Sequence, residues 1–139
     1  MLLSVFTRIL QRYSHAISDA WNVENMALRR ISPPEFDVEL AIAYSTSDNI
    51  TGKQIYCNSG CWLHEDAAEA LLIAIGFAKD LGLKFRIFDA FRPLEAQWNL
   101  WNHNPDPKFL VHPQKGSPHS RGVAIDLTLI KSENNNLLN

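Results

Sequence analysis

The most informative stretch of the chain is residues 117–129, which read SPHSRGVAIDLTL. The alternation in its second half predicts a strand that carries apolar side chains on one face and Asp126 on the other. A carboxylate among apolar strand residues is unfavourable unless a metal or a cation compensates its charge. His119 lies seven residues earlier, and Gly122 lets the backbone turn between the two. An imidazole and a carboxylate brought together in this way suit zinc.

Spacing alone leaves other interpretations of these residues open. His119 can be a histidine of a surface loop, and Asp126 can be a buried ion-pair partner of Arg92 or Arg121. One histidine and one aspartate at this separation are a weak metal signal, because a catalytic zinc takes three protein ligands. The pair is therefore a hypothesis that needs support from other parts of the chain.

Outward from this stretch, the pattern of apolar residues predicts helices and strands in mixed order. Strands are expected over three segments, residues 36–44, 83–89 and 122–130. Helices are expected over residues 64–81 and from Pro93 to about His103, with a long loop at residues 104–118. Because strands and helices do not alternate regularly, the sequence favours an α+β fold.

The N-terminal part of the chain is expected to be separate from the rest. Residues 1–33 end in a basic pair and a Ser-Pro-Pro breaker, so they are interpreted as an extension that precedes one domain at residues 34–139. Arg8 interrupts the apolar start of the chain, and Arg12 follows it. This order favours an amphipathic helix or a non-native leader over a secretory signal.

Composition narrows the class of protein. The chain has 139 residues, 46% of them hydrophobic, and a formal net charge of -2, so we expect no nucleic-acid partner. No apolar run approaches the ~20 residues of a membrane span, and a cytoplasmic location is expected, or a periplasmic one if the N-terminus is an atypical signal. Cys57 and Cys61 can form a small disulfide loop, supply half of a metal site, or stay unpaired.

Two further blocks support the zinc hypothesis. Residues 89–93 read DAFRP and precede Ala96-Gln97, and Tyr44 precedes DNITG at residues 48–52. Together with residues 117–129, these blocks resemble, in the same order, the D-alanyl-D-alanine dipeptidase family, the VanX type of zinc metallopeptidase. The related D,D-carboxypeptidases share the Ser-x-His and Asp core but match the Asn-Ile-Thr-Gly and Asp-Leu-Thr-Leu segments less well.

The resemblance implies a fold, an activity and a set of site residues. The fold is a small antiparallel sheet with helices packed on it, as in hedgehog and D,D-peptidase domains, and the activity is zinc-dependent hydrolysis of the small molecule D-Ala-D-Ala in cell-wall metabolism. Carried over by position, the roles are zinc ligation by His119 and Asp126, oxyanion stabilisation by Arg92, positioning of Arg92 by Asp89, and a pocket border formed by Ser117 and Tyr44.

Some features depart from the family pattern or keep an alternative. Arg92 can instead form a structural salt bridge with Asp89 or Glu95, and Phe91 replaces the usual tyrosine. His103 and His112 match no ligand position, so we expect both in loops. If the 139-residue chain proved active on its own, His112 would be the first residue to test as a further ligand.

The resemblance also implies a third ligand and a general base, in a Glu-x-x-His segment near the C-terminus. No histidine follows Asp126 here. The chain is therefore expected to end within a family element, to bind zinc weakly, to have little activity and to self-associate through exposed apolar surface. The alternatives are an enzyme completed by parts from elsewhere, an inactive remnant, or a module that binds D-Ala-D-Ala without hydrolysis.

Overall fold

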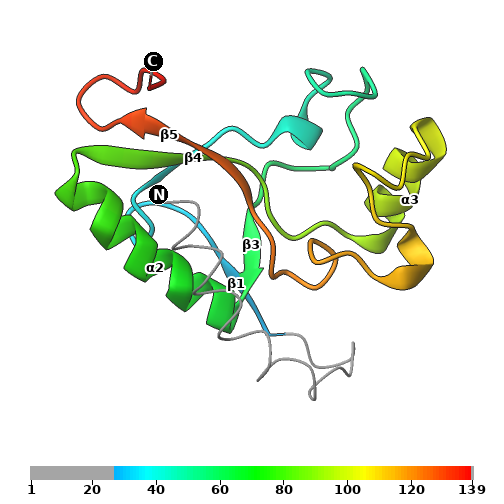
Figure 1. The fold of residues 1–139 in the computed structure, drawn as a ribbon, viewed down its shortest axis with the longest axis horizontal. Coiled ribbons are helices and arrows are strands. Elements are labelled where there is room, and N and C mark those ends of the chain that lie inside the picture. The colour runs from blue at the N-terminus through cyan, green and yellow to red at the C-terminus, as the bar shows by residue number, and fades with distance from the viewer. Residues whose placement is uncertain (1–26, 139) are drawn as a thin grey trace.

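The structure, a computed structural model, describes residues 27–138 (Figure 1). Within them, the expected α+β class is confirmed. The elements in chain order are β1 (Leu28–Arg30), β2 (Val38–Leu40), the 3-10 turn η2 (Ala43–Ser45), β3 (Trp62–His64), α2 (Glu65–Asp80), β4 (Leu83–Asp89), α3 (Leu94–His103), the 3-10 turn η3 (Pro113–Lys115) and β5 (Asp126–Lys131).

The main sheet has three strands in the order β2-β4-β5. β5 is antiparallel to β4, as expected, but β2 runs parallel to β4, so the sheet is mixed. β4 has the predicted bounds, whereas β5 begins at Asp126 and not at residue 122. The strand begins later because residues 118–122 form turns closed by backbone hydrogen bonds, among them Gly122 N–H to the His119 carbonyl. These turns bring His119 back toward the start of the strand.

Helix α2 lies against β4 and supplies much of the core (Figure 1). The imidazole of His64 caps its N-terminus by accepting from Asp66 N–H, and Glu65 and Asp66 favour that end electrostatically. Its buried face is mostly alanine, which lets the helix approach the sheet closely. Leu71 on the helix and Ile87 on β4 are fully buried at this contact. Among the described residues, no helix combines the length and hydrophobicity needed to cross a bilayer.

Strand β1 lies within the segment that was expected to be an extension, yet it packs with the domain. Leu28 pairs with His64 and Arg30 with Trp62 in a two-stranded antiparallel sheet. Ile31 is fully buried and donates its N–H to the Cys61 carbonyl. The described part of residues 1–33 is thus structural, and the prolines at 33 and 34 lie in a turn between β1 and β2. The helix or leader expected over the first 21 residues lies outside the described residues.

Gly122 allows the closest backbone approach in this region. Its φ is +70°, and a Cβ there would lie 2.9 Å from the backbone nitrogen of His64 and 3.0 Å from a methyl of Leu28. Gly82, which follows the C-cap of α2, has a similar φ of +69°, but a Cβ there would meet no atom within 4 Å. Comparing substitutions at the two glycines therefore distinguishes the cost of a positive φ from the cost of a steric clash.

We expect Gly122→Ala to lower the free energy of unfolding by more than Gly82→Ala does. A left-handed φ costs an alanine about 1–2 kcal/mol at either position, and only at Gly122 must β1 and β3 also move. Chemical denaturation of the two variants measures the difference. Equal destabilisation would show that the turn can shift without disturbing the β1–β3 sheet.

Candidate metal centre

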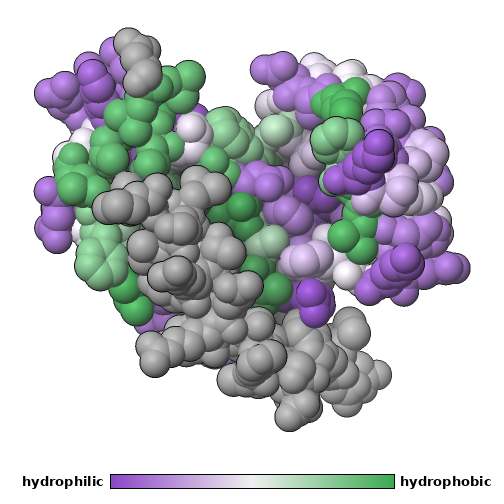
Figure 2. Space-filling view, viewed as in Figure 1, coloured by the Kyte–Doolittle hydropathy of each residue, from purple (hydrophilic) through white to green (hydrophobic). Residues whose placement is uncertain are grey.

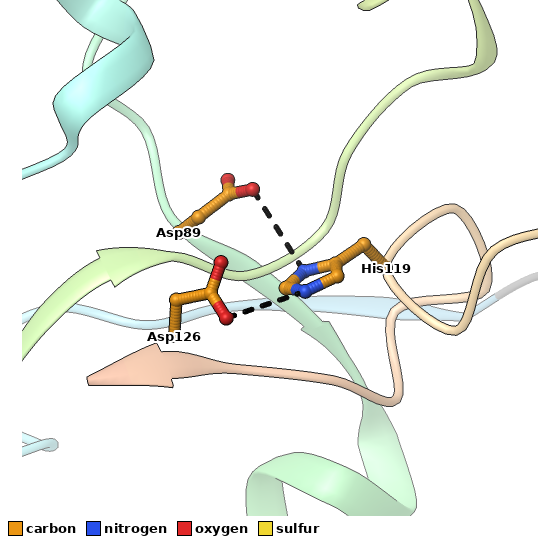
Figure 3. Close-up of side chains that lie close together, drawn as sticks. All are labelled: Asp89, His119 and Asp126. Carbon is orange, nitrogen blue, oxygen red and sulfur yellow. Dashed lines mark ion pairs between the residues drawn. The ribbon is translucent and has the colours of Figure 1, made fainter. Parts of the chain in front are cut away.

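Three side chains that can bind a metal meet at the end of the main sheet (Figure 3). Asp89 ends β4, Asp126 begins β5, and the two are partners across a register irregularity in the β4–β5 ladder. His119 reaches them from the preceding turn, with Nε2 3.5 Å from Asp126 Oδ1 and Nδ1 3.8 Å from Asp89 Oδ2. The strand pairing and the turn therefore bring together the His119 and Asp126 side chains that the sequence singled out.

The orientation of the His119 ring is fixed by its second nitrogen. Nδ1 lies 2.8 Å from the backbone carbonyl of Ala90. Because a carbonyl can only accept, Nδ1 carries a proton, and Nε2 is the ring nitrogen that faces Asp126. The backbone holds the same turn, since Arg92 N–H donates to the His119 carbonyl at 3.0 Å. A carbonyl that fixes the tautomer in this way is typical of metal-binding histidines.

The spacing of Nε2 and Asp126 Oδ1 suits one zinc ion. Zinc bonds of about 2.0–2.1 Å in tetrahedral geometry separate two ligand atoms by about 3.3 Å, close to the 3.5 Å observed. Asp89 fits such a role less well. Its Oδ2 accepts from Arg92 Nε at 2.9 Å and Nη2 at 2.6 Å, and its Oδ1 accepts from the Tyr56 hydroxyl at 2.7 Å. Asp89 therefore serves Arg92, and His119 with Asp126 form the candidate ligand pair.

Asp126 is not the buried carboxylate that its apolar neighbours indicated. Its side chain is 54% exposed, because it stands at the first position of β5 at the open end of the sheet. A hydrogen bond from His119 holds the pKa of Asp126 below its usual value despite partial desolvation, and the charges of His119 and Arg92 add to this effect. The ion pair with Arg92 considered from the sequence exists as a longer contact, 3.7 Å from Nη2 to Oδ2. The carboxylate is thus ionised and open to a ligand.

Arg92 is the charged group at the base of the site. Its side chain is 5% exposed and pairs with Asp89, which is 2% exposed. Burial lowers the pKa of Arg92, but the charge and hydrogen bonds of Asp89 outweigh it, so the net shift is upward and the guanidinium stays charged. Gln97 Oε1 accepts from Nη1 at 2.9 Å. The salt bridge with Asp89 considered as an alternative is therefore real, and it leaves Nη2 facing Asp126.

Tyr44 and Ser117, the expected pocket border, lie on two sides of this centre. The ring of Tyr44 stands 5.3 Å from the guanidinium carbon of Arg92, and burial raises the pKa of its hydroxyl. Ser117 is 3% exposed, and its Oγ accepts from the backbone N–H of His119 at 3.2 Å. Tyr44 thus covers the arginine, and Ser117 holds the turn that carries the histidine.

Sequence reasoning missed Tyr56 and gave Gln97 no role of its own. Tyr56 packs edge-on against Tyr44, with ring centroids 5.6 Å apart, and donates to Asp89. Its pKa is raised well above the usual range, first by burial and then by the Asp89 charge. The signal for Gln97 was present in the sequence, as a polar residue between Ala96 and Leu100 on the apolar face of a predicted helix.

The two remaining histidines of this region lie elsewhere. His103 ends α3 and does not lie in a loop as expected. His112 packs against Trp98 and Trp101, with ring centroids 5.5 and 4.8 Å away, and its Nδ1 accepts from Gln114 N–H. These contacts use the imidazole to fasten its loop to α3, and His112 is absent from the metal-binding group of the described residues.

An open cleft of about 390 Å³ lies next to α3 and is distinct from the centre. Its walls are formed by residues of the loop before Tyr56 and by Asn99, Asn102 and His103 of the helix. None of the site residues singled out by the sequence lines it. A small-molecule site built on Arg92 and His119 would therefore be separate from this cleft.

Comparison with known proteins adds a family assignment to this geometry. The model of the peptidase M15 family, described as D-ala-D-ala dipeptidase, matches residues 23–139. A curated relative, the D-alanyl-D-alanine dipeptidase of Escherichia coli (strain K12), is 49% identical over 102 residues. The aligned part covers 73% of this chain and 52% of the relative, so the chain spans about half the length of that relative. The family match includes β1 and all the residues of the centre.

Removing a carboxylate charge should destabilise the fold much more at the buried Asp89–Arg92 pair than at an exposed ion pair. Asp89→Asn would leave the Arg92 charge without its partner in a buried site, which typically costs about 3–5 kcal/mol. Asp37→Asn removes one partner of the exposed ion pair with Lys84 and should cost less than about 1 kcal/mol. Denaturant unfolding of both variants checks this, and a small effect at Asp89 would mean that Arg92 is solvated in solution.

Proposed function

Because the chain belongs to the D-ala-D-ala dipeptidase family, we propose that it supplies the His119–Asp126 part of a zinc centre that hydrolyses D-Ala-D-Ala. The observation that carries this proposal is the 3.5 Å approach of His119 Nε2 to Asp126 Oδ1, with Nδ1 engaged by the Ala90 carbonyl. A tautomer fixed in this way leaves Nε2 as the metal-binding atom.

The two ligands define part of the metal site. When bound, zinc supplies the Lewis acidity that activates a water and polarises the scissile carbonyl. A catalytic zinc takes three protein ligands and a water, and the water needs a general base. Among the described residues only Asp89 joins this pair, and Asp89 is engaged by Arg92 and Tyr56, so we assign the further ligand and the base to residues outside the described part. A polypeptide of these residues alone would then bind zinc weakly and turn over little substrate.

Arg92 is proposed to stabilise the charge that develops on the substrate oxygen. The guanidinium is buried, charged and held by Asp89, and Nη2 lies 3.7 Å from Asp126, on the side of the metal ligands. A preorganised cation in a water-poor site stabilises an oxyanion strongly, because no reorganisation is needed as the charge forms. Tyr44 covers this cation and would exclude water from it.

The substrate class follows from the same groups. The Ser117 hydroxyl accepts from His119 N–H and keeps its own proton for a substrate oxygen. Arg92 and Ser117 can thus read polar atoms of a short peptide, and Tyr44 limits the space beside them. We propose a D,D-dipeptide as substrate, in agreement with the name of the E. coli relative. A D,D-carboxypeptidase of the same fold would instead accept a longer peptide.

A second candidate function is binding of D-Ala-D-Ala without hydrolysis. The observation that favours it is the Arg92 group itself, which is complete within the described residues and needs no metal for its geometry. A charged guanidinium can bind a carboxylate or carbonyl oxygen as it stands. Binding without turnover in a protein that also carries the further ligand and base would select this candidate.

The chain is also proposed to self-associate. Ile73, Phe77 and Leu81 recur every fourth residue along α2 and are each more than half exposed. Figure 2 shows hydrophobic surface on this side of the molecule and mostly hydrophilic surface on the side of α3. Sedimentation of Phe77→Ser tests the proposal against Phe109→Ser, whose residue is the more exposed but lies in a separate loop. If Phe77→Ser abolishes association and Phe109→Ser does not, the exposed apolar residues of α2 form the interface. If neither change affects association, the proposal is contradicted.

The compartment is proposed to be the cytoplasm, with the periplasm as the alternative that cell fractionation would reveal. Cys57 and Cys61 are both unpaired thiols in the structure. Burial raises the pKa of Cys61 to about 12, which keeps that thiol protonated and unreactive. Recovery of the protein in the periplasmic fraction would overturn the cytoplasmic assignment.

The substrate proposal predicts selective turnover of a short D,D-peptide. An active form of the protein that includes the further ligand and base should hydrolyse D-Ala-D-Ala and neither L-Ala-L-Ala nor a longer peptide ending in D-Ala. Release of free alanine measures all three reactions under identical conditions. Equal turnover of the three would contradict the dipeptidase proposal, and preference for the longer peptide would indicate a carboxypeptidase.

The ligand proposal predicts that His119→Ala weakens zinc binding at least tenfold, because loss even of a group that orients a ligand typically costs about 10–100-fold in affinity. His103→Ala removes a solvent-exposed imidazole outside the centre and should leave affinity unchanged. Competition with a metal chelator at constant pH measures both variants in the 139-residue chain. Equal affinity of His119→Ala and the unmodified chain would remove His119 from the site.

A further inference from the structure

Gln97 is a fully buried amide at the end of the first turn of α3. A buried amide is unfavourable unless both of its polar atoms have partners. Here Oε1 accepts from Arg92 Nη1 at 2.9 Å, and Nε2 donates to the Val111 carbonyl at 2.7 Å. The partners fix the orientation of the amide, because a guanidinium can only donate and a carbonyl can only accept.

The first contact completes the restraint on Arg92. Asp89 holds the guanidinium through Nε and Nη2, along one edge of the planar group. Gln97 holds Nη1, on another edge. Nη2, the atom nearest Asp126, is therefore placed by contacts on both sides. Removal of Gln97 would leave Nη1 without this partner, and the guanidinium could tilt about the edge that Asp89 holds.

The second contact reaches the loop that carries the site. Val111 is followed by His112, which packs against Trp98 and Trp101, and then by η3, Ser117 and His119. Gln97 is thus a one-residue connection between the Arg92 guanidinium and the backbone of this loop. A shift of about 1 Å between a catalytic cation and the metal ligands can cost about 100-fold in rate.

We propose that Gln97 is a positioning residue that fixes the direction of Arg92 and its distance from the His119 loop. This inference rests on the proposed function, since it assumes that Arg92 acts on the substrate. Gln97 does not touch the substrate. It acts through Arg92 on one side and through Val111 on the other.

Two substitutions separate the contacts. Gln97→Met has a similar shape and makes neither hydrogen bond, and Gln97→Glu keeps an acceptor for Arg92 but loses the donor to Val111. In an active form of the protein, Gln97→Met should lower kcat by roughly 10- to 100-fold, the range for one hydrogen bond to a charged group, with KM changed less than about threefold. Gln97→Glu should retain more of kcat. Gln114→Met, at an exposed position of η3, is the matched control and should change neither constant.

A double-mutant cycle with Arg92→Ala decides between positioning and general stability. If Gln97 acts through Arg92, Gln97→Met should cause no more than about a twofold further loss in the Arg92→Ala background. The same fold-loss in both backgrounds would show a merely structural role and overturn the proposal. If Gln97→Met fails to fold, the cycle is run with Gln97→Glu, and the same comparison applies.

A readout without catalysis keeps this proposal separate from the proposed function. In the 139-residue chain, hydrogen exchange of the Arg92 Nη protons, followed by NMR, should be at least about tenfold faster in Gln97→Met than in Gln114→Met. Unchanged exchange overturns the positioning role. Faster exchange, together with no turnover of D-Ala-D-Ala by the unsubstituted active form, supports the positioning role and counts against the proposed function alone.

Discussion

The ion pair between Arg92 and Asp89 is the contact on which the rest of the site depends. Both side chains are almost completely removed from water, so each requires the other, and neither can be lost without leaving an uncompensated charge. The pair is anchored on both sides, by Tyr56 on the carboxylate and by Gln97 on the guanidinium. Arg92 also faces Asp126, the carboxylate that pairs with Asp89 across the sheet. Its positive charge therefore lies near both carboxylates.

The opposing requirements of two carboxylates explain how the site divides its work. Asp89 and Asp126 are partners in the β4–β5 ladder, and like charges at such positions repel. The structure resolves this by burying one carboxylate against a cation and leaving the other half-exposed beside the His119 imidazole. Asp89 thereby becomes a structural group, and Asp126 remains available as a ligand. Both residues are aspartates, so their different roles come from their hydrogen bonds: the oxygens of Asp89 already accept from Tyr56 and Arg92.

Local patterns predicted the elements with strong periodicity. β4 has the predicted bounds, α2 is one residue shorter at each end than predicted, and α3 begins one residue later and ends at His103 as predicted. These elements were predictable because alternation, helical spacing and the proline before α3 act within each segment. The parallel pairing of β2 and the pairing of β1 with β3 depend on contacts between distant segments, which periodicity does not report. For the site, the approach of His119 to Asp126 followed from turn and strand. The exposure of Asp126 and the partnership of Tyr56 with Asp89 did not, because they depend on how β4 ends against β5 and on where the loop before β3 lies.

The packing of His112 between two indoles has an optical consequence. Indole emission depends on the groups around the ring, and Trp98 and Trp101 both lie edge-on against His112. Emission from these two tryptophans will therefore change when the loop leaves α3. The third described tryptophan, Trp62, lies in β3 and provides a background independent of this contact. Intrinsic tryptophan fluorescence can thus report whether the segment that leads to His119 is packed on α3.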